Sequence, residues 1–367
     1  MAPTALDDDW QALRDAFPHL RQRVYLDTAA AGLVWHGHGA AVARFYDQVK
    51  SRGYDARPEW QAMTQRVRGR LARLLGVADS DVTFVSNTTE GLNLAVHSLR
   101  WRAGERIVMA ADEFPSVVRA WEPARRAGAD VVAVPVASEA QRQAALLAAL
   151  DARTRVLVVS QTHSGSGTTL DLSTLGRECR ARDALLMVDG IQALGAVATD
   201  ASSTDFYAAS FFKWMLSGFG VGVLVTSARA RAALEPAYRG YANMDDAAQL
   251  QYAHVNIPAM YGLDATLDYF ERIGWARVHE RVRALGSHLV ARAASLRLDL
   301  VTPPEQRAGI FVLRCADGDA LRRQLDQRGI SVSARGVGVR VSPHFYNTTD
   351  EVDRLLSALT RYARSSV

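Results

Sequence analysis

The sequence predicts an α/β protein with a large domain, in which a mostly parallel sheet is flanked by helices, and a smaller α+β domain at the C-terminal end. Short apolar runs of strand length alternate with helical patterns, which is typical of a parallel sheet covered on both faces. The chain has 367 residues, enough for two domains or one large α/β unit. We assign residues 20–255 to the large domain and 256–367 to the small one, with 1–19 packing near the small domain.

The expected strands of the large domain follow one another along the chain. They are residues 82–86, 106–110, 130–136, 156–160, 185–188 and 221–226, with helical patterns at 92–99, 141–149 and 175–181. Val and Leu dominate the runs at 156–160 and 185–188, as expected of strands buried on both faces. Ligands of such open sheets gather at the carboxyl ends of the strands. The polar clusters after Ser86, after Ser160 and at Asp189 are therefore expected at one edge.

The C-terminal part of the chain has a different pattern. A long helix is expected to begin around residues 258–274, and strand candidates follow at 310–314 and 337–341. A final helix is expected over 350–363. Helices and strands that do not alternate regularly indicate the smaller α+β domain.

Composition excludes several classes of protein. A hydrophobic fraction of 49% and a charged fraction of 22% are values of soluble globular proteins, and no apolar run reaches the length of a membrane span. The net charge is +4, but the arginines are scattered, so we expect no nucleic-acid partner. Residues 1–10 do not resemble a secretory signal. Cys179 and Cys315 form neither a metal nor a disulfide pattern, so we expect no metal site and a cytoplasmic protein.

Lysine is almost absent from the chain. Of 43 basic residues, only Lys50 and Lys213 are lysines. A buried lysine can lose its proton and form a Schiff base with a carbonyl group, which arginine cannot do. Lys213 lies in an apolar segment, 210–214, which favours the neutral amine, whereas Lys50 is interpreted as a surface residue. The alternative is that a GC-rich genome replaced most lysines and left Lys213 as a remnant.

Asp189 ends the apolar run at 185–188 and precedes Gly190, twenty-four residues before Lys213. An acid that keeps a pyridine nitrogen protonated, combined with a Schiff-base lysine, is what pyridoxal phosphate requires. Gln192 can donate to the phenolic oxygen of that ring. An Asx-turn or a helix cap is the structural alternative for Asp189.

The turn at residues 87–91 opens a predicted helix. Its backbone N–H groups and threonine hydroxyls can cradle a phosphate, although an ordinary capped helix would have the same sequence. The turn, the acid and the lysine are more specific together than any one of them. A nicotinamide dehydrogenase would need a Gly-x-Gly-x-x-Gly turn, a pattern that Gly165 and Gly167 do not form.

Six blocks spread over nearly the whole chain carry a family resemblance: residues 24–30, 87–91, 160–168, 188–195, 210–222 and 340–348. With them the sequence resembles the class V aminotransferase family of fold-type I pyridoxal-phosphate enzymes. The similar branch includes cysteine desulfurases, isopenicillin N epimerase-like enzymes and kynureninases. The resemblance implies pyridoxal 5′-phosphate as cofactor, an amino acid as substrate, and a homodimer with shared active sites.

The resemblance also implies a role for each matching position. Lys213 would hold the cofactor and move the Cα proton. The other cofactor-binding residues would be Asp189 at the pyridine nitrogen, Gln192 at the ring oxygen, Thr89 and Ser210 at the phosphate with Thr88 nearby, and Phe114 stacked on the ring. For Phe114, a core phenylalanine is the alternative.

On the substrate side, Arg340 would grip the α-carboxylate in a bidentate pair; the alternative is a surface arginine. Ser164 lies where desulfurase relatives have an asparagine near that carboxylate. His163 is a candidate second acid or base, or merely a turn residue. Arg335 could recognise a second anionic group.

The departures from the family pattern matter as well. Phe212 replaces a histidine that binds phosphate in many relatives, and His254 stands where relatives present a threonine to the phosphate of the neighbouring subunit. We hypothesise that the partner's His254 replaces the lost donor; a solvated or core histidine is the alternative. Segment 331–339 lacks the desulfurase cysteine, and Cys315 lies in a strand pattern. Desulfuration through an enzyme persulfide is therefore not expected.

The predicted reaction begins with loss of the Cα proton of an amino acid to give a carbanion. We favour an aminotransferase. A lyase acting by β-elimination and an amino-acid epimerase stay open as alternatives. A cofactor-binding regulator without turnover is the least favoured, because the chain has Asp189, Gln192, Lys213 and Arg340 together.

Overall fold

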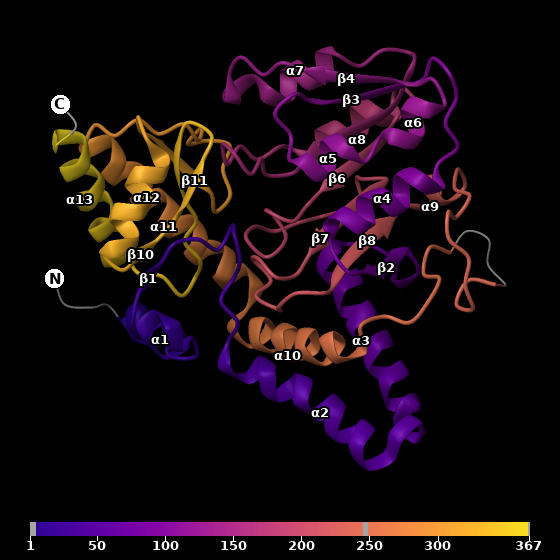
Figure 1. The fold of residues 1–367 in the computed structure, drawn as a ribbon, viewed down its shortest axis with the longest axis horizontal. Coiled ribbons are helices and arrows are strands. Elements are labelled where there is room, and N and C mark those ends of the chain that lie inside the picture. Colours follow the sequence, from indigo (N-terminus) through magenta and orange to yellow (C-terminus); the bar gives the residue numbers. More distant parts are fainter. Residues whose placement is uncertain (1–4, 245–248, 366–367) are drawn as a thin grey trace.

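The computed structural model describes residues 5–244 and 249–365. A seven-stranded sheet lies at the centre of the larger unit, with strand order β2-β8-β7-β6-β5-β3-β4 (Figure 1). Its strands are β2 (Val82–Val85), β3 (Arg106–Ala110), β4 (Asp130–Val134), β5 (Thr154–Ser160), β6 (Leu185–Asp189), β7 (Phe206–Ser210) and β8 (Gly222–Thr226). The pairs from β4 through β7 are parallel, and only β8 runs against its neighbours. The predicted mostly parallel sheet is confirmed.

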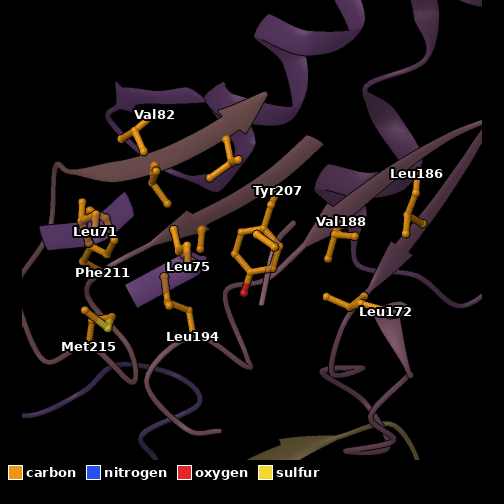
Figure 2. Close-up of a cluster of buried hydrophobic side chains, with 14 of the residues drawn as sticks. Leu71, Leu75, Val82, Leu172, Leu186, Val188, Leu194, Tyr207, Phe211 and Met215 are labelled. Carbon is orange, nitrogen blue, oxygen red and sulfur yellow. The ribbon is translucent and has the colours of Figure 1, made fainter. Parts of the chain in front are cut away.

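Both faces of the sheet are apolar because successive side chains of a strand point to opposite sides. In β5, Val156 and Val158 belong to one buried cluster, and Leu157 and Val159 belong to the other. Figure 2 shows the second cluster, in which Val188 of β6 lies beside Tyr207 of β7, its partner in the sheet. The strands therefore read as continuous apolar runs, as the sequence indicated.

Helices cover the two faces separately. One face is covered by α3 (Arg57–Leu75), α7 (Arg142–Ala148), α8 (Leu172–Arg180) and α10 (Ile257–Ile273). The opposite face is covered by α4 (Thr88–Ser98), α5 (Pro115–Arg119), α6 (Glu122–Arg126) and α9 (Ala228–Arg231). Helix α2 (His36–Arg52) packs against α10 (Figure 1). None of the described helices is long and apolar enough to cross a lipid bilayer.

The smaller unit combines helices with a three-stranded antiparallel sheet, β11-β12-β9. Its elements are α11 (Trp275–Ser295), β9 (Phe311–Arg314), α12 (Gly318–Gln327), β10 (Ile330–Ser331), β11 (Ser333–Arg335), β12 (Gly338–Val341) and α13 (Thr349–Ser365). The N-terminal strand β1 (Val24–Tyr25) pairs with β10, and α1 (Ala5–Arg14) precedes it. The segment around β1 thus joins the last third of the chain, while the boundary between 255 and 256 stays a prediction. The prediction that residues 1–10 are not a secretory signal falls partly on residues 1–4. These four residues lie outside the described residues.

Two differences from expectation affect the elements that carry the polar clusters of the large unit. Strand β7 was not predicted, because its sequence Phe-Tyr-Ala-Ala-Ser has two alanines, which rarely favour strands. The helix expected from residue 92 begins at Thr88, since the Asn87 side chain caps it by accepting from the Glu90 N–H at 2.9 Å. Residues 87–91 therefore form the first turn of α4.

Candidate active site

A cavity opens where the strands of the central sheet end, as predicted for a parallel sheet. Strands β5, β6 and β7 end at Ser160, Asp189 and Ser210, and all three residues line it. The other lining residues are Asn87, Thr88, Thr89, Phe114, Ser116, Thr162, Ser164, Ile191, Gln192, Phe212 and Lys213. The structure therefore brings Lys213 and Asp189 to one cavity, together with the predicted residues Thr88, Thr89, Phe114, Ser164, Gln192 and Ser210.

The Lys213 amine lies beside two aromatic rings in the turn after β7. Its Nζ is 5.6 Å from the centroid of Phe212 and 5.9 Å from that of Phe114. Burial lowers the pKa of Lys213 to about 8, although the charge of Asp189 acts in the opposite direction. The positive charges of Arg340 and Arg335 lower this pKa further. The amine is thus much closer to neutrality than an ordinary lysine.

Asp189 is buried, with 4% of its surface exposed. Its Oδ1 accepts from the Ile191 N–H at 3.0 Å, and its other carboxylate oxygen has no hydrogen-bond partner among the described residues. Burial raises the pKa of Asp189 to about 6, against the positive charge of Lys213. The carboxylate is therefore ready to pair with a cationic group in the cavity.

The turn that carries Lys213 is held in place through Trp214. The Trp214 indole N–H donates to Gln192 Oε1 at 3.0 Å, and the Gln192 amide donates to the Ala29 carbonyl at 3.1 Å. His344 donates from Nε2 to the Trp214 carbonyl at 2.9 Å, and burial lowers its pKa to about 3, so it is neutral. Gln192 also lines the cavity, and its second amide N–H forms no hydrogen bond with the described residues. The lysine is thus anchored to the N-terminal segment and to the loop after β12.

Neutral donors gather at the N-terminus of α4. The Thr88 N–H donates to Ser210 Oγ at 2.7 Å, and the Ser210 N–H donates to Thr88 Oγ1 at 2.9 Å. Thr89 Oγ1 lies 2.7 Å from Ser116 Oγ. The eleven-residue α4 directs its positive end toward these groups. They form a suitable cup for a phosphate.

Phe212 lines the same cavity, and its ring stacks on Phe219 with centroids 4.4 Å apart. Among the described lining residues, only Lys213 carries a positive charge. Phe114 is 42% exposed and forms part of the cavity wall, so the core alternative for this ring is wrong.

Arg340 lies beside the cavity with 2% of its surface exposed, so the surface alternative is also wrong. Its Nη1 donates to the Ser164 carbonyl at 3.3 Å, and its Nη2 lies 3.6 Å from Asp27 Oδ1. The Nε of Arg340 has no hydrogen-bond partner among the described residues. Ser333 Oγ lies 2.8 and 2.7 Å from the two carboxylate oxygens of Asp27, to which its hydroxyl donates. The guanidinium thus keeps an unused donor next to Ser164.

Sequence reasoning missed Asp27. Its carboxylate is the counter-charge of Arg340, and burial raises its pKa against the effects of Ser333 and Arg340. The sequence did contain a signal for Asp27, because this residue lies in block 24–30, which resembles the opening strand of the family. Its role emerges only when β1 pairs with the C-terminal segment, as the Asp27–Ser342 bridge shows.

His163 is not among the residues that line the cavity. Its Nε2 donates to the Asp112 carbonyl at 3.0 Å, and its Nδ1 lies 2.9 Å from Ser166 Oγ. Arg142 lies beside the ring and binds the carboxylates of Asp112 and Glu139 at 2.6 and 2.8 Å. This placement favours the turn-residue alternative over a second acid or base, because both ring nitrogens are already engaged.

His254 and Arg335 lie away from the lining of the cavity. The His254 ring contacts Tyr241, with centroids 5.1 Å apart, and lines a separate hollow beside Asn256. Its proposed action on a partner subunit stays a prediction. Arg335 is exposed on β11, and its charge acts on Lys213, Asp27 and Arg340. It therefore faces the same region as the candidate substrate arginine.

The two cysteines are outside the cavity lining. Cys179 is fully buried in the large core, and burial raises its pKa to about 12. Cys315 is partly buried at the small-domain sheet, and burial raises its pKa as well. Both thiols are thereby less nucleophilic than a free cysteine, consistent with the expected absence of persulfide chemistry.

Comparisons with known proteins agree with this geometry. The protein-family model described as aminotransferase class-V matches residues 24–355. The chain is 26% identical to a probable cysteine desulfurase of Methanothermobacter thermautotrophicus, over 96% of this chain and 97% of the relative. It is 29% identical to the isopenicillin N epimerase of Amycolatopsis lactamdurans, over 95% and 99% of the two chains.

Solved structures are similar over the whole fold. The cysteine desulfurase of Thermococcus onnurineus NA1 superposes with a TM-score of 0.86 at 20% identity, covering 100% of both chains. The cystine C–S lyase C-DES superposes with a TM-score of 0.86 at 22% identity, covering 94% of this chain and 99% of that one. These likenesses confirm the predicted fold-type I architecture.

Proposed function

The chain belongs to the class V aminotransferase family of pyridoxal-phosphate enzymes, and from this premise we propose that it is an aminotransferase acting on an amino acid. Its cofactor is pyridoxal 5′-phosphate. The cavity fits this group by the chemistry of its donors: an amine at Lys213, an unpaired carboxylate oxygen at Asp189, and hydroxyl and N–H donors at the start of α4. Bound there, the cofactor delocalises the electron pair that remains when the Cα proton leaves.

The choice of transamination depends on one observation. Lys213 and Asp189 are the only titratable side chains among the described residues that line the cavity. Asp189 is assigned to the pyridine nitrogen, so Lys213 is left as the single group that can take and return protons. Transamination needs one base that removes the Cα proton and returns a proton to the carbon on the other side of the substrate nitrogen. Epimerisation by two bases needs a second acid, and Phe114 and Phe212 supply none.

Arg340 is proposed to bind the substrate α-carboxylate, with Ser164 beside it. The support is its burial, its free Nε and its contact with the Ser164 carbonyl at 3.3 Å. Relatives named for cysteine or cystine chemistry act on amino acids, which supports this substrate class. Arg335 is proposed to favour substrates with a second anionic group, because its exposed side chain adds a positive charge next to Arg340.

We also propose a homodimer, in which His254 of the partner subunit supplies the phosphate donor that is lost where Phe212 replaces a histidine. A His254→Ala variant is expected to bind pyridoxal phosphate more weakly while it keeps its dimeric mass. Unchanged cofactor affinity in the dimer would contradict this role. The two unpaired cysteines fit a reducing compartment, so we place the protein in the cytoplasm.

A screen of amino acids with 2-oxoglutarate or pyruvate as amino acceptor tests the reaction type. We expect equal amounts of new oxo acid and new amino acid, and neither product with Lys213→Arg, which keeps the charge but cannot form the imine. Pyruvate and ammonia released together with sulfide from cysteine, or with cysteine persulfide from cystine, would identify a lyase instead. Accumulation of the inverted amino acid without an acceptor would identify an epimerase.

A further inference from the structure

Glu113 is a buried carboxylate behind the cavity, between β3 and α5, with 7% of its surface exposed. It accepts from the Ser160 N–H at 2.8 Å and from Ser160 Oγ at 2.6 Å. The Phe114 N–H donates to it at 3.3 Å. Glu113 therefore joins the end of β5 to the segment that carries the exposed ring of Phe114.

Glu113 also lies close to the acid of the cofactor site. Ser160, which holds it, is the register partner of Asp189 in the β5–β6 pair. The negative charge of Glu113 raises the pKa of Asp189. Neither carboxylate forms an ion pair with an arginine, lysine or histidine in the part of the chain that the structure describes.

Two buried carboxylates without an ion pair are energetically costly, because burial removes the water that would stabilise their charge. Lys213 is the only cation that lines the cavity among the described residues, and burial favours its neutral form. The site is therefore one positive charge short. A protonated pyridine nitrogen held against Asp189 would supply that charge.

We propose that Glu113 is a positioning residue for the cofactor: its negative charge, acting with that of Asp189, favours the protonated ring nitrogen of bound pyridoxal phosphate. Glu113 does not line the cavity, so its charge acts on the ring nitrogen at a distance, together with that of Asp189. This role rests on the cofactor assignment and is independent of whether the reaction is transamination, elimination or epimerisation.

The test compares two ligands on the apoprotein: pyridoxal phosphate and its analogue with carbon in place of the ring nitrogen, which cannot be protonated. Both carry the same aldehyde and phosphate. In Glu113→Gln we expect about threefold to tenfold weaker binding of pyridoxal phosphate and unchanged binding of the analogue. A ring labelled with ¹⁵N should show a protonated nitrogen in the wild type and a less protonated one in the variant.

Three controls separate charge from structure. Glu105→Gln removes a carboxylate elsewhere in the same domain, and Ser160→Ala removes one hydrogen bond but keeps the Glu113 charge. Both should keep the wild-type preference between the ligands. Glu113→Asp keeps the negative charge and should also keep the wild-type preference between the ligands. This variant maintains the test if Glu113→Gln folds poorly.

If Glu113→Gln weakened the binding of both ligands equally, the proposal would be overturned, and Glu113 would have only a structural role through its hydrogen bonds. Unchanged binding of both would overturn it too. Failure of the wild type to bind either ligand would instead overturn the cofactor assignment on which the inference depends.

Discussion

The depressed pKa of Lys213 can be measured against an internal reference, because Lys50 is the only other lysine. Burial lowers the pKa of Lys213 to about 8 from the model-compound value of 10.5. At pH 8, about half of the Lys213 amines are then neutral, compared with about 0.3% of an ordinary lysine. The neutral fraction is therefore about 150-fold larger at this position.

Competitive acetylation of the apoprotein with limiting acetic anhydride reports this difference, since only the neutral amine reacts. Peptides containing Lys50 and Lys213 are quantified by mass spectrometry between pH 6 and pH 11, conditions chosen to bracket both amines. The labelling curve of Lys213 should reach its midpoint near pH 8, well below the range of an ordinary lysine. Because the midpoint is compared, the poorer access to Lys213 does not affect the result.

Two variants give opposite shifts. The Asp27 carboxylate raises the pKa of Lys213, so Asp27→Asn should move the midpoint to lower pH. The Arg335 guanidinium lowers that pKa, so Arg335→Gln should move it to higher pH. Parallel curves for Lys50 and Lys213, or shifts of the same sign in both variants, would refute the reasoning.

Three further outcomes follow from the geometry. Arg340→Lys should lower kcat/KM on the order of 100-fold, because ammonium cannot replace a bidentate guanidinium; steady-state rates within threefold of the wild type would contradict the assignment. Replacing Cys179 and Cys315 with alanine should leave kcat within about twofold, and a loss above tenfold would indicate thiol chemistry. Gly195→Ala should reduce the free energy of unfolding by at least ~1 kcal/mol, since Gly195 has φ +93° and an added Cβ would lie 2.7 Å from the Trp214 carbonyl; an unchanged denaturation midpoint would disprove it.

The sequence predicted those strands whose patterns are strong in isolation. Strands β5 and β6 are runs of Val, Leu and Met buried on both faces. Short runs of this kind are typical of buried strands in a parallel sheet. Strand β7 has a weak pattern of its own and exists because β6 and β8 pair with it on either side. This segment forms a strand because distant segments pair with it, and the pattern of a single sequence does not contain that information.

The same distinction holds for the site. Asp189 and Lys213 could be identified because their residue types carry the chemistry and their neighbours are apolar. Glu113 and Asp27 could not, since their meaning comes from partners far along the chain, Ser160 and Arg340. His163 follows a strand end and was expected beside the cavity. The turn after it directs its ring to the buried Arg142 cluster instead.

Covalent trapping tests the central claim most directly. Protein loaded with pyridoxal phosphate is reduced with borohydride, digested and mapped by mass spectrometry. The account predicts loss of the visible absorption band of the imine and a pyridoxyl group on the Lys213 peptide, with none on the Lys50 peptide. A pyridoxyl group on Lys50 alone, or a loaded protein without the absorption band and without label, would contradict it.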